Sequence, residues 1–319
     1  MPITNFRQFQ AFRVSLQTAA QLCELHHLAA PTSIRRLGRG EVNAVFDLTL
    51  EDSQCIILKV GVRDQGVEKL QREQALVHRF QQTGELPVPQ WTKVALTPNM
   101  LPHPHMFMEK IGGRDGDTLW ANLDEGQRRQ VLRNCGATLH TLHQAALSET
   151  VRPHFAPPPT PAQWAQELTE AFQGALANLR SQSWIGQGPM KTFASVWDEY
   201  CGVLAHPFEA AILHGDFQLH NLRLDSSTLA VAGLLDWDNA CLGPGFTDAR
   251  DFELNLFLTN PKLALPFWEG YGKALTQDEH VRLKLTMLNR ALQLFVAYQG
   301  PMDNYNVAAI EKLARSIAQ

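Results

Sequence analysis

The chain has 319 residues, of which 45% are hydrophobic and 19% are charged, so it has ample material for a hydrophobic core. Its formal net charge of -4 argues against a nucleic-acid-binding surface and is compatible with a cationic substrate. No apolar run approaches the ~18 residues of a membrane span, and the opening segment lacks the apolar core of a signal peptide. Five widely spaced cysteines without a Cys-x-x-Cys pair favour reduced thiols. We therefore expect a soluble cytoplasmic protein without a nucleic-acid or membrane partner.

The first predicted elements are a helix and a pair of strands joined by a glycine turn. Apolar residues recur with helical spacing over residues 6–28, which predicts one helix. Residues 34–48 follow as strand, turn and strand, with Gly38 and Gly40 in the turn and Asn43 just after it. Glycines let the backbone approach a ligand and direct N–H groups at phosphate oxygens. A plain hairpin turn explains a lone Gly-x-Gly more simply, but the segments that follow favour phosphate binding.

One lysine stands inside an apolar strand predicted over residues 55–60. Burying Lys59 is costly unless a charged partner lies close to it. The next predicted helix supplies one, because Glu73 falls on the apolar face that Leu70 and Val77 define. We therefore predict a Lys59–Glu73 ion pair, the alternative being that each side chain reaches water independently.

A further apolar strand ends in a glycine pair, Gly112-Gly113, after which helical patterns dominate. This segment resembles the linker between the two lobes of the family that the motif at residues 214–236 indicates. The resemblance implies an N-terminal nucleotide-binding lobe over 1–106, a linker over 107–113 and a C-terminal catalytic and substrate-binding lobe over 114–319.

The most informative stretch combines three polar residues with two short apolar segments. Residues 222–224 and 230–235 flank a polar turn and predict an antiparallel β-hairpin. Asn221 enters the first strand and Asp236 leaves the second, so both should lie at the open end of the hairpin. Mg²⁺ prefers oxygen ligands and usually takes one or two protein carboxylates. The pair is a candidate magnesium site, and Asp216, earlier in the same loop, can accept a proton from an attacking hydroxyl.

These residues also resemble a known signature. The spacing from His214 through Asp216 to Asn221, followed by an apolar strand that ends in Asp236, is similar to the catalytic motif of the protein-kinase-like fold. The variant His-Gly-Asp with Asp-Trp-Asp resembles the aminoglycoside phosphotransferase and choline kinase-like family. That family continues with a Gly-Asp-Pro-x-x-Asp turn; residues 243–248 depart from its middle and keep its final aspartate.

The resemblance implies a fold and an activity. The fold would be α+β and two-lobed, protein-kinase-like, with an antiparallel sheet and a helix in the N-terminal lobe and a mostly helical C-terminal lobe. The activity would be that of a small-molecule kinase, a phosphotransferase with an alcohol group as acceptor, which uses Mg²⁺ and ATP, with GTP as the alternative donor. The acceptor would be an aminoglycoside, choline or ethanolamine, another amino-alcohol or a sugar.

The resemblance also assigns roles to the site residues. Asp216 would be the catalytic base, Lys59 held by Glu73 would bind the α and β phosphates, and Asn221 and Asp236 would hold Mg²⁺. The full nucleotide-binding set comprises Gly38, Gly40, Asn43, Lys59, Glu73, Glu109 and Ile111, the last two through backbone groups at the adenine edge.

The determinants of acceptor specificity stay open. Asp248, Asp251 and Glu253 form an acidic cluster that suits an amino sugar or a quaternary amine, and it equally suits helix capping and a solvated helix start. Asp238 lies on the side of Asp236 if that strand continues, where it would touch metal or substrate. A cation-binding cage and a core position are both open for the aromatic residues Trp237, Trp268 and Tyr271.

Two rival functions come from other classes. A metal-dependent phosphohydrolase would use His214 and Asp216 as ligands, but it leaves the glycine turn, Lys59 and Glu73 unexplained. A catalytically silent nucleotide-binding protein of the same fold is disfavoured, because the lysine, the base and both metal ligands are present. The sequence does not indicate the acceptor, the choice between ATP and GTP, or the oligomeric state.

Overall fold

The chain forms two compact units in the computed structural model, each with a hydrophobic core of its own. The structure describes residues 6–38, 43–62, 66–96, 100–301 and 306–317. The first unit comprises residues 1–119, 147–155 and 220–240, and the second comprises residues 120–146, 156–219 and 241–319.

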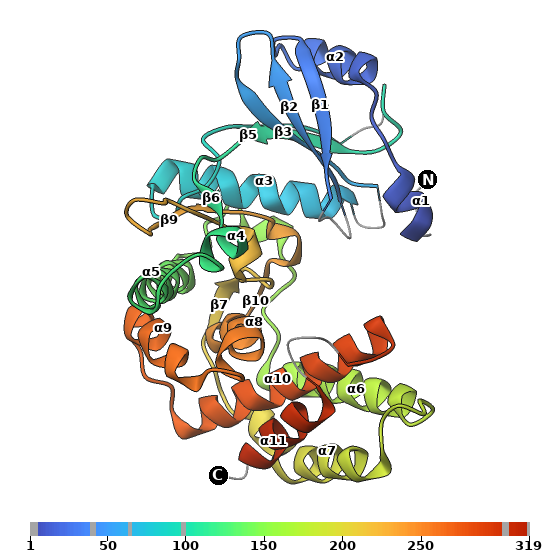
Figure 1. Ribbon diagram of the computed structural model, residues 1–319, viewed down its shortest axis with the longest axis vertical. Coiled ribbons are helices and arrows are strands. Elements are labelled where there is room, and N and C mark those ends of the chain that lie inside the picture. Colours follow the sequence, from blue (N-terminus) through green and yellow to red (C-terminus); the bar gives the residue numbers. More distant parts are fainter. Residues whose placement is uncertain (1–5, 39–42, 63–65, 97–99, 302–305, 318–319) are drawn as a thin grey trace. The chain divides into compact units, whose positions relative to one another are not determined.

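The first unit is built on a five-stranded antiparallel sheet with the strand order β1-β2-β3-β5-β4 (Figure 1). Buried and half-buried positions alternate along β2, as expected for a strand with one face on a core. β3 pairs with β2 on one side and β5 on the other, so Lys59 lies in the middle of the sheet. The strands are β1 (Pro31–Leu37), β2 (Ala44–Leu50), β3 (Cys55–Val60), β4 (Thr92–Ala95) and β5 (His105–Glu109).

Helix α3 (Gly66–Thr83) lies beside this sheet and carries Glu73 (Figure 1). Its first residue approaches the end of β3 closely. A Cβ atom on Gly66 would lie 2.8 Å from the carbonyl oxygen of Gly61, so any larger side chain would force the two segments apart. This contact fixes where the helix begins relative to the strand that carries Lys59.

Two helices precede the sheet, so the prediction of one helix over residues 6–28 is wrong. They are α1 (Phe6–Ala11) and α2 (Leu16–Leu25). The side chain of Ser15 accepts a hydrogen bond from the backbone N–H of Thr18 at 3.0 Å. Such an N-cap starts a new helix and accounts for the break.

A smaller sheet of the first unit has the order β6-β8-β9. Its strands β8 (Leu222–Leu224) and β9 (Val231–Leu234) pair antiparallel, which confirms the predicted hairpin. In the turn, Oδ1 of Asp225 accepts hydrogen bonds from the backbone N–H groups of Ser227 and Thr228 at 2.9 and 2.7 Å. This unit also holds β6 (Arg114–Asp115), the turn η1 (Arg152–His154) and η4 (Trp237–Asn239). Most residues of α4 (Gly116–Trp120) and η3 (Leu219–Asn221) belong to it as well.

The second unit is mostly helical (Figure 1). Glycines let two of its helices approach closely, since a Cβ atom on Gly136 would lie 2.1 Å from the carbonyl oxygen of Phe267. In its core, Phe172 stacks on Trp197 with ring centroids 4.0 Å apart. The helices are α5 (Glu125–Gln144), α6 (Pro161–Leu179), α7 (Gln187–Tyr200), α8 (Arg250–Phe252), α9 (Ala264–Tyr271), α10 (Gln277–Tyr298) and α11 (Val307–Ser316).

A two-stranded antiparallel sheet supports the loops of the second unit. Its strands are β7 (Ala210–Leu213) and β10 (Cys241–Pro244), with Leu213 opposite Cys241. The motif with Asp216 begins directly after β7. The remaining short turns are η2 (Cys201–Ala205), η5 (Gly245–Ala249), the π-helical η6 (Glu253–Phe257) and η7 (Pro261–Leu263).

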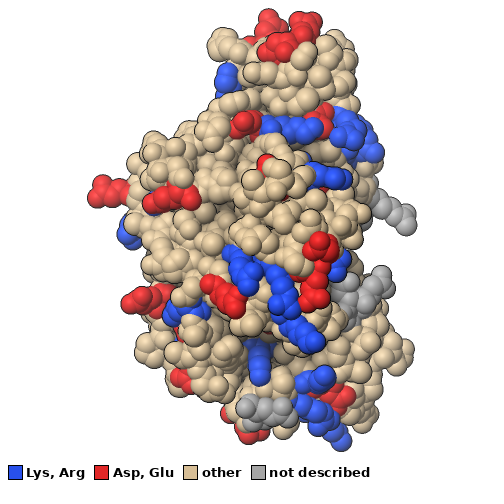
Figure 2. Space-filling model, turned by 60° about the vertical axis from the view of Figure 1, so that its left-hand side comes forward, with Lys and Arg blue, Asp and Glu red and all other residues tan. Residues whose placement is uncertain are grey.

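The sheet with its helix in one unit and the mostly helical second unit confirm the predicted α+β architecture. The linker expected over 107–113 begins inside β5, and its place as the lobe boundary stays a prediction. Within the described ranges, no helix has the length and apolarity needed to cross a membrane. On the face drawn in Figure 2, lysine and arginine are interspersed with aspartate and glutamate, so neither sign covers that face.

Candidate active site

Lys59 is the centre of a buried cluster of charges in the first unit. The residue is 4% exposed, and its Nζ donates to Oε2 of Glu73 at 2.7 Å. The same ammonium group donates to Oδ1 of Asp236 and to Oδ1 of Asp238, each at 2.8 Å. The predicted Lys59–Glu73 ion pair is therefore confirmed, and it is joined by two further carboxylates.

Helix α3 presents Glu73 to this cluster through its apolar face. Leu70, Val77 and Phe80 are fully buried on the helix, and Glu73 is only 2% exposed among them. An acid at the spacing of the apolar residues must follow them inward. Because an unpaired buried carboxylate would be costly, the pairing with Lys59 satisfies both residues.

The cluster carries more negative than positive charge. Burial alone would lower the pKa of Lys59, but the adjacent Asp236, Asp238 and Glu73 outweigh it and hold that pKa well above its usual value. Burial raises the pKa of Glu73 to about 7, against the opposing effect of Lys59. Because three carboxylates surround one ammonium group, the cluster can accept a further positive charge.

The hairpin brings Asn221 and Asp236 to the same end. The backbone N–H of Leu235 donates to the carbonyl oxygen of Asn221 at 2.9 Å, directly before Asp236. The predicted convergence of the two residues is confirmed. Asp236 has φ 64° and ψ 71°, a left-handed backbone that is uncommon outside glycine and frequent at functional sites. Its side chain is 47% exposed and thus within reach of a ligand.

Asp238 takes a position that the sequence did not indicate. The strand does not continue past Asp236, because the turn η4 begins at Trp237. Asp238 is 4% exposed, accepts from Lys59, and accepts a further hydrogen bond from Nδ2 of Asn43. Burial raises the pKa of Asp238 despite the nearby lysine. Asn43, a predicted nucleotide-binding residue, therefore contacts the Lys59 cluster through an aspartate.

The donor set at this end of the hairpin fits a magnesium ion. Asp236 offers a half-exposed carboxylate beside Asn221, and carboxylate and amide oxygens are ligands that Mg²⁺ accepts. The cluster's excess of negative charge favours a divalent cation there. In the described part of the chain, no group of three His, Cys, Asp or Glu residues could hold a metal ion by itself. A cation here would thus need further ligands, and Mg²⁺ commonly takes phosphate oxygens and water for that purpose.

Other predicted nucleotide-binding residues lie around the sheet. Gly38 follows β1, and no atom of the described residues lies within 4 Å of the place where a Cβ atom would stand. Gly40 lies outside the described residues. Glu109 ends β5 and its Oε2 accepts a hydrogen bond from the backbone N–H of Gln90, while the side chain of Ile111 packs against Gly233 of β9. The role of Glu109 and Ile111 in adenine binding stays a prediction.

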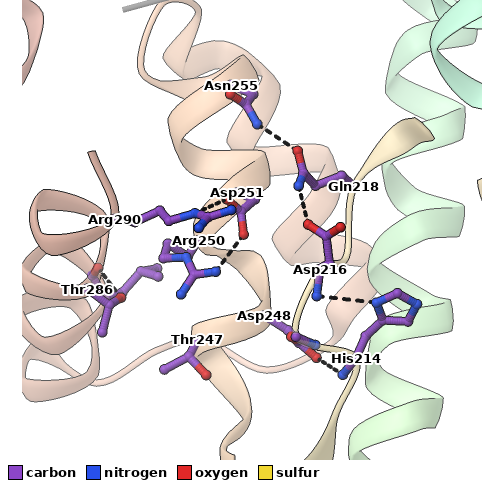
Figure 3. A network of polar contacts seen from close by, with 12 residues as sticks. His214, Asp216, Gln218, Thr247, Asp248, Arg250, Asp251, Asn255, Thr286 and Arg290 are labelled. Carbon is purple, nitrogen blue, oxygen red and sulfur yellow. Dashed lines mark hydrogen bonds and ion pairs between the residues drawn. The ribbon is translucent and has the colours of Figure 1, made fainter. Parts of the chain in front are cut away.

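Asp216 lies in the second unit, on a loop held by buried polar contacts. Figure 3 shows His214, Asp216 and Asp248 together. The backbone N–H groups of His214 and Gly215 donate to the two oxygens of Asp248 at 2.6 and 2.8 Å. The N–H of Asp216 donates to Nδ1 of the fully buried His214 at 3.3 Å. These contacts show that His214 holds the backbone of the loop in place.

Asp248, in the turn η5, anchors the loop that carries Asp216. It is 4% exposed, and Nε2 of His143 lies 3.3 Å from its Oδ2, while Nδ1 of His143 contacts the hydroxyl of Tyr271 at 2.9 Å. Burial alone would raise the pKa of Asp248, but His143, His214 and the N–H of Gly215 together lower it. The carboxylate therefore stays charged and anchors two backbone N–H groups.

The rest of the acidic cluster is also engaged within the protein. Asp251 is 3% exposed and pairs with Arg250 at 2.7 Å and Arg290 at 3.4 Å. Glu253 accepts a hydrogen bond from Nε1 of Trp268 at 2.9 Å, and burial raises its pKa to about 7. Of the three aromatic residues considered for a cage, Trp237 is fully buried in the core of the first unit, where it stacks on Phe80, while Trp268 and Tyr271 contact each other in the second unit.

The architecture places the chain in the class with a protein-kinase-like fold. The complex of APH(2″)-IIIa with GDP and kanamycin has a TM-score of 0.69 and 14% identity, covering 95% of this chain and 99% of that chain. Macrolide 2′-phosphotransferase MphH from Brachybacterium faecium has a TM-score of 0.62 and 15% identity, covering 93% and 97%. At these identities the similarity establishes the fold.

The sequence comparison identifies the family. A model described as the phosphotransferase enzyme family matches residues 33–278, and the chain belongs to that family. A relative from Mus musculus, acyl-CoA dehydrogenase family member 10, is 21% identical over 292 residues, which cover 88% of this chain. The match covers 25% of that protein, so the chain spans about a quarter of the length of this curated relative.

Proposed function

We propose that the chain transfers the γ-phosphate of ATP, with GTP as the alternative donor, to a hydroxyl group of a small molecule. The observation that carries this proposal is the buried Lys59, held at 2.7 to 2.8 Å by Glu73, Asp236 and Asp238. A lysine fixed by a helix carboxylate and placed beside a candidate metal ligand is what binding of a nucleotide phosphate requires.

The first unit's residues divide the work on the nucleotide. Lys59 binds the α and β phosphates, and Glu73 keeps its ammonium group in place. Asn221 and Asp236 would hold Mg²⁺, which would neutralise charge on the phosphates. Backbone groups from Glu109 to Ile111 contact the adenine edge, and the linker over 107–113 joins the two lobes.

Asp216 acts on the acceptor. Its carboxylate takes the proton of the acceptor hydroxyl while the hydroxyl oxygen bonds to the γ-phosphorus. The bond between that phosphorus and the oxygen bridging to the β-phosphate breaks, and ADP leaves. His214 and Asp248 keep the backbone of this loop in place, so their contribution is indirect.

The acceptor belongs to a broad set of hydroxyl compounds. Solved neighbours carry kanamycin or gentamicin, and others are macrolide phosphotransferases, which makes aminoglycosides and macrolides reasonable first acceptors. Asp248 and Asp251 are committed to backbone N–H groups and to arginines, so they offer little to a cationic acceptor. The candidates therefore extend from aminoglycosides to neutral sugars, while choline, ethanolamine and other amino-alcohols would need other groups to bind their cation.

An ATP-consumption screen across these acceptors, with Mg²⁺ present or removed by a chelator, tests the proposal. We expect at least one acceptor to stimulate ADP formation in the presence of Mg²⁺ only. Binding of Mg·ATP without transfer to any acceptor would instead indicate a silent nucleotide-binding protein. Hydrolysis of phosphate esters without ATP would indicate a phosphohydrolase.

A further inference from the structure

The carboxylate of Asp216 is one end of a short chain of amide hydrogen bonds. Nε2 of Gln218 donates to Oδ1 of Asp216, and Nδ2 of Asn255 donates to Oε1 of Gln218 at 3.0 Å (Figure 3). All three side chains are half-buried and belong to the second unit. No role was expected for Gln218 or Asn255 from the sequence.

The order of donors fixes which end of the Gln218 amide faces Asp216. An ionised carboxylate only accepts hydrogen bonds, and an amide offers both a donor and an acceptor end. Because Asn255 donates to the oxygen of Gln218, the NH₂ group of Gln218 is directed at Asp216. The orientation of one side chain thus depends on the donor supplied by another.

Asn255 is held by an unusual element. It lies in the π-helical turn η6 (Glu253–Phe257), where the N–H of Leu258 donates to the carbonyl oxygen of Glu253 at 2.7 Å. Leu254 and Phe257, which flank Asn255, are buried in the unit. Single π-helical turns occur often at functional sites, because the extra residue redirects a side chain.

We propose that Gln218, oriented by Asn255, is a positioning residue that holds the carboxylate of Asp216 for proton transfer. The inference rests on the proposed phosphotransferase function. A neutral donor suits this task, because it fixes one oxygen of the carboxylate without adding a full charge beside the proton acceptor. A base misplaced by a fraction of an ångström loses rate rather than affinity for the nucleotide.

Two substitutions of Asn255, by aspartate and by alanine, test the proposal. In Asn255→Asp the side chain keeps its shape but can only accept, so the Gln218 amide turns its NH₂ group to the new carboxylate and its oxygen to Asp216. In Asn255→Ala the donor is lost without forcing that reversal. We expect kcat to fall about ten-fold in Asn255→Asp and about three-fold in Asn255→Ala, with the KM for ATP within two-fold of wild type.

A purely structural role predicts the opposite order, because the isosteric aspartate should disturb packing less than alanine. Gln218→Ala should lower kcat about ten-fold, and adding Asn255→Asp to it should cost nothing more, since the reversed amide is gone. Gln166→Ala is the matched control: Gln166 donates to Glu170 at 2.8 Å on an exposed helix face and should leave kcat unchanged.

The outcomes separate this inference from the proposed function. A wild-type chain that transfers no phosphate would overturn the proposed function. A wild-type chain that transfers phosphate, with Asn255→Asp as active as wild type or faster than Asn255→Ala, would overturn the positioning role. Thermal unfolding of every variant confirms that folded protein is compared, and the Asn255 pair decides the question if Gln218→Ala does not fold.

Discussion

Lys59 of the first unit and Asp216 of the second are held by different kinds of interaction. Lys59 is buried among three carboxylates, so its position depends on full charges. Asp216 contacts an amide and a histidine, in a loop whose backbone N–H groups are anchored by Asp248. The contrast suits a division of roles in which the charged cluster binds phosphate and metal, and the loop positions the carboxylate of Asp216 for proton transfer.

The largest effect should come from removing the carboxylate of Asp216, the proposed base. Asp216→Asn retains the shape of the side chain and an oxygen that can accept from Gln218, but it cannot take a proton. We expect kcat to fall about 10³-fold while binding of ATP changes less than two-fold. Steady-state kinetics and calorimetric titration of a non-hydrolysable ATP analogue check both parts; a variant with its rate intact would show that Asp216 is not the base.

Removing the lysine should affect binding and stability together. Lys59→Met leaves the buried Glu73 and Asp238 without their cation, so we expect the KM for ATP to rise at least about ten-fold and stability to fall by about 3 kcal/mol. Since the pKa of Glu73 is raised to about 7 even beside Lys59, the folded variant should retain protons that the unfolded chain has lost. Because Glu73 of the folded wild type loses its own proton only near pH 7, the stability deficit of the variant should grow as the pH rises above about 7.

Chemical unfolding at several pH values measures that deficit. Lys59→Arg, which retains the positive charge, is the control and should be less destabilised than Lys59→Met. Unchanged ATP kinetics in Lys59→Met would contradict the role given to this lysine.

The loop in the second unit should respond to loss of its anchor. In Asp248→Asn one of the two backbone N–H groups at 214 and 215 meets an NH₂ group instead of an oxygen, so we expect a loss of about 2 kcal/mol at pH 7. The pKa of Asp248 is lowered on folding, so its contribution is present above the usual aspartate pKa and is lost as the pH falls. The difference in unfolding free energy between wild type and variant should shrink on acidification, and a constant difference would contradict this account.

A neutral histidine of the first unit should make the stability of the protein fall in mild acid. His105 is fully buried, and burial together with His26, whose Nε2 lies 3.2 Å away, lowers its pKa to about 4. In the unfolded chain His105 takes up a proton near pH 6.5, whereas in the folded chain it does so only near pH 4. The free energy of unfolding should therefore decrease as the pH falls from about 6.5 to 4, by at most about 3 kcal/mol. His105→Phe should flatten that part of the pH profile of unfolding, and an unchanged slope would assign it to other groups.

The sequence predicted the parts that follow from local pattern. The hairpin that ends in Asp236 follows from two apolar segments around a polar turn, and the ion pair of Lys59 follows from an acid on the apolar face of a helix. A local pattern was also missed: Ser15 has the chemistry of an N-cap and divides the predicted first helix.

What the sequence could not predict depends on backbone geometry and distant contacts. The left-handed conformation of Asp236 ends the strand, and Asp238 therefore meets Lys59 instead of lying beside Asp236 on an extended chain. Asp248 finds its partners in backbone N–H groups, which carry no side-chain pattern. The link from Asn255 to Gln218 likewise needs a π-helical turn that periodicity does not reveal.

The central claim is that Lys59, Asp216, Asn221 and Asp236 serve one transfer from Mg·ATP. Phosphorus NMR of a mixture of ATP, Mg²⁺ and the best acceptor tests it most directly, with wild type and Asp216→Asn compared at saturating ATP. We predict one phosphate ester of the acceptor for each ADP formed by wild type, no ester without Mg²⁺, and none from the variant. Formation of inorganic phosphate without any acceptor ester, or equal ester formation by Asp216→Asn, would contradict the account.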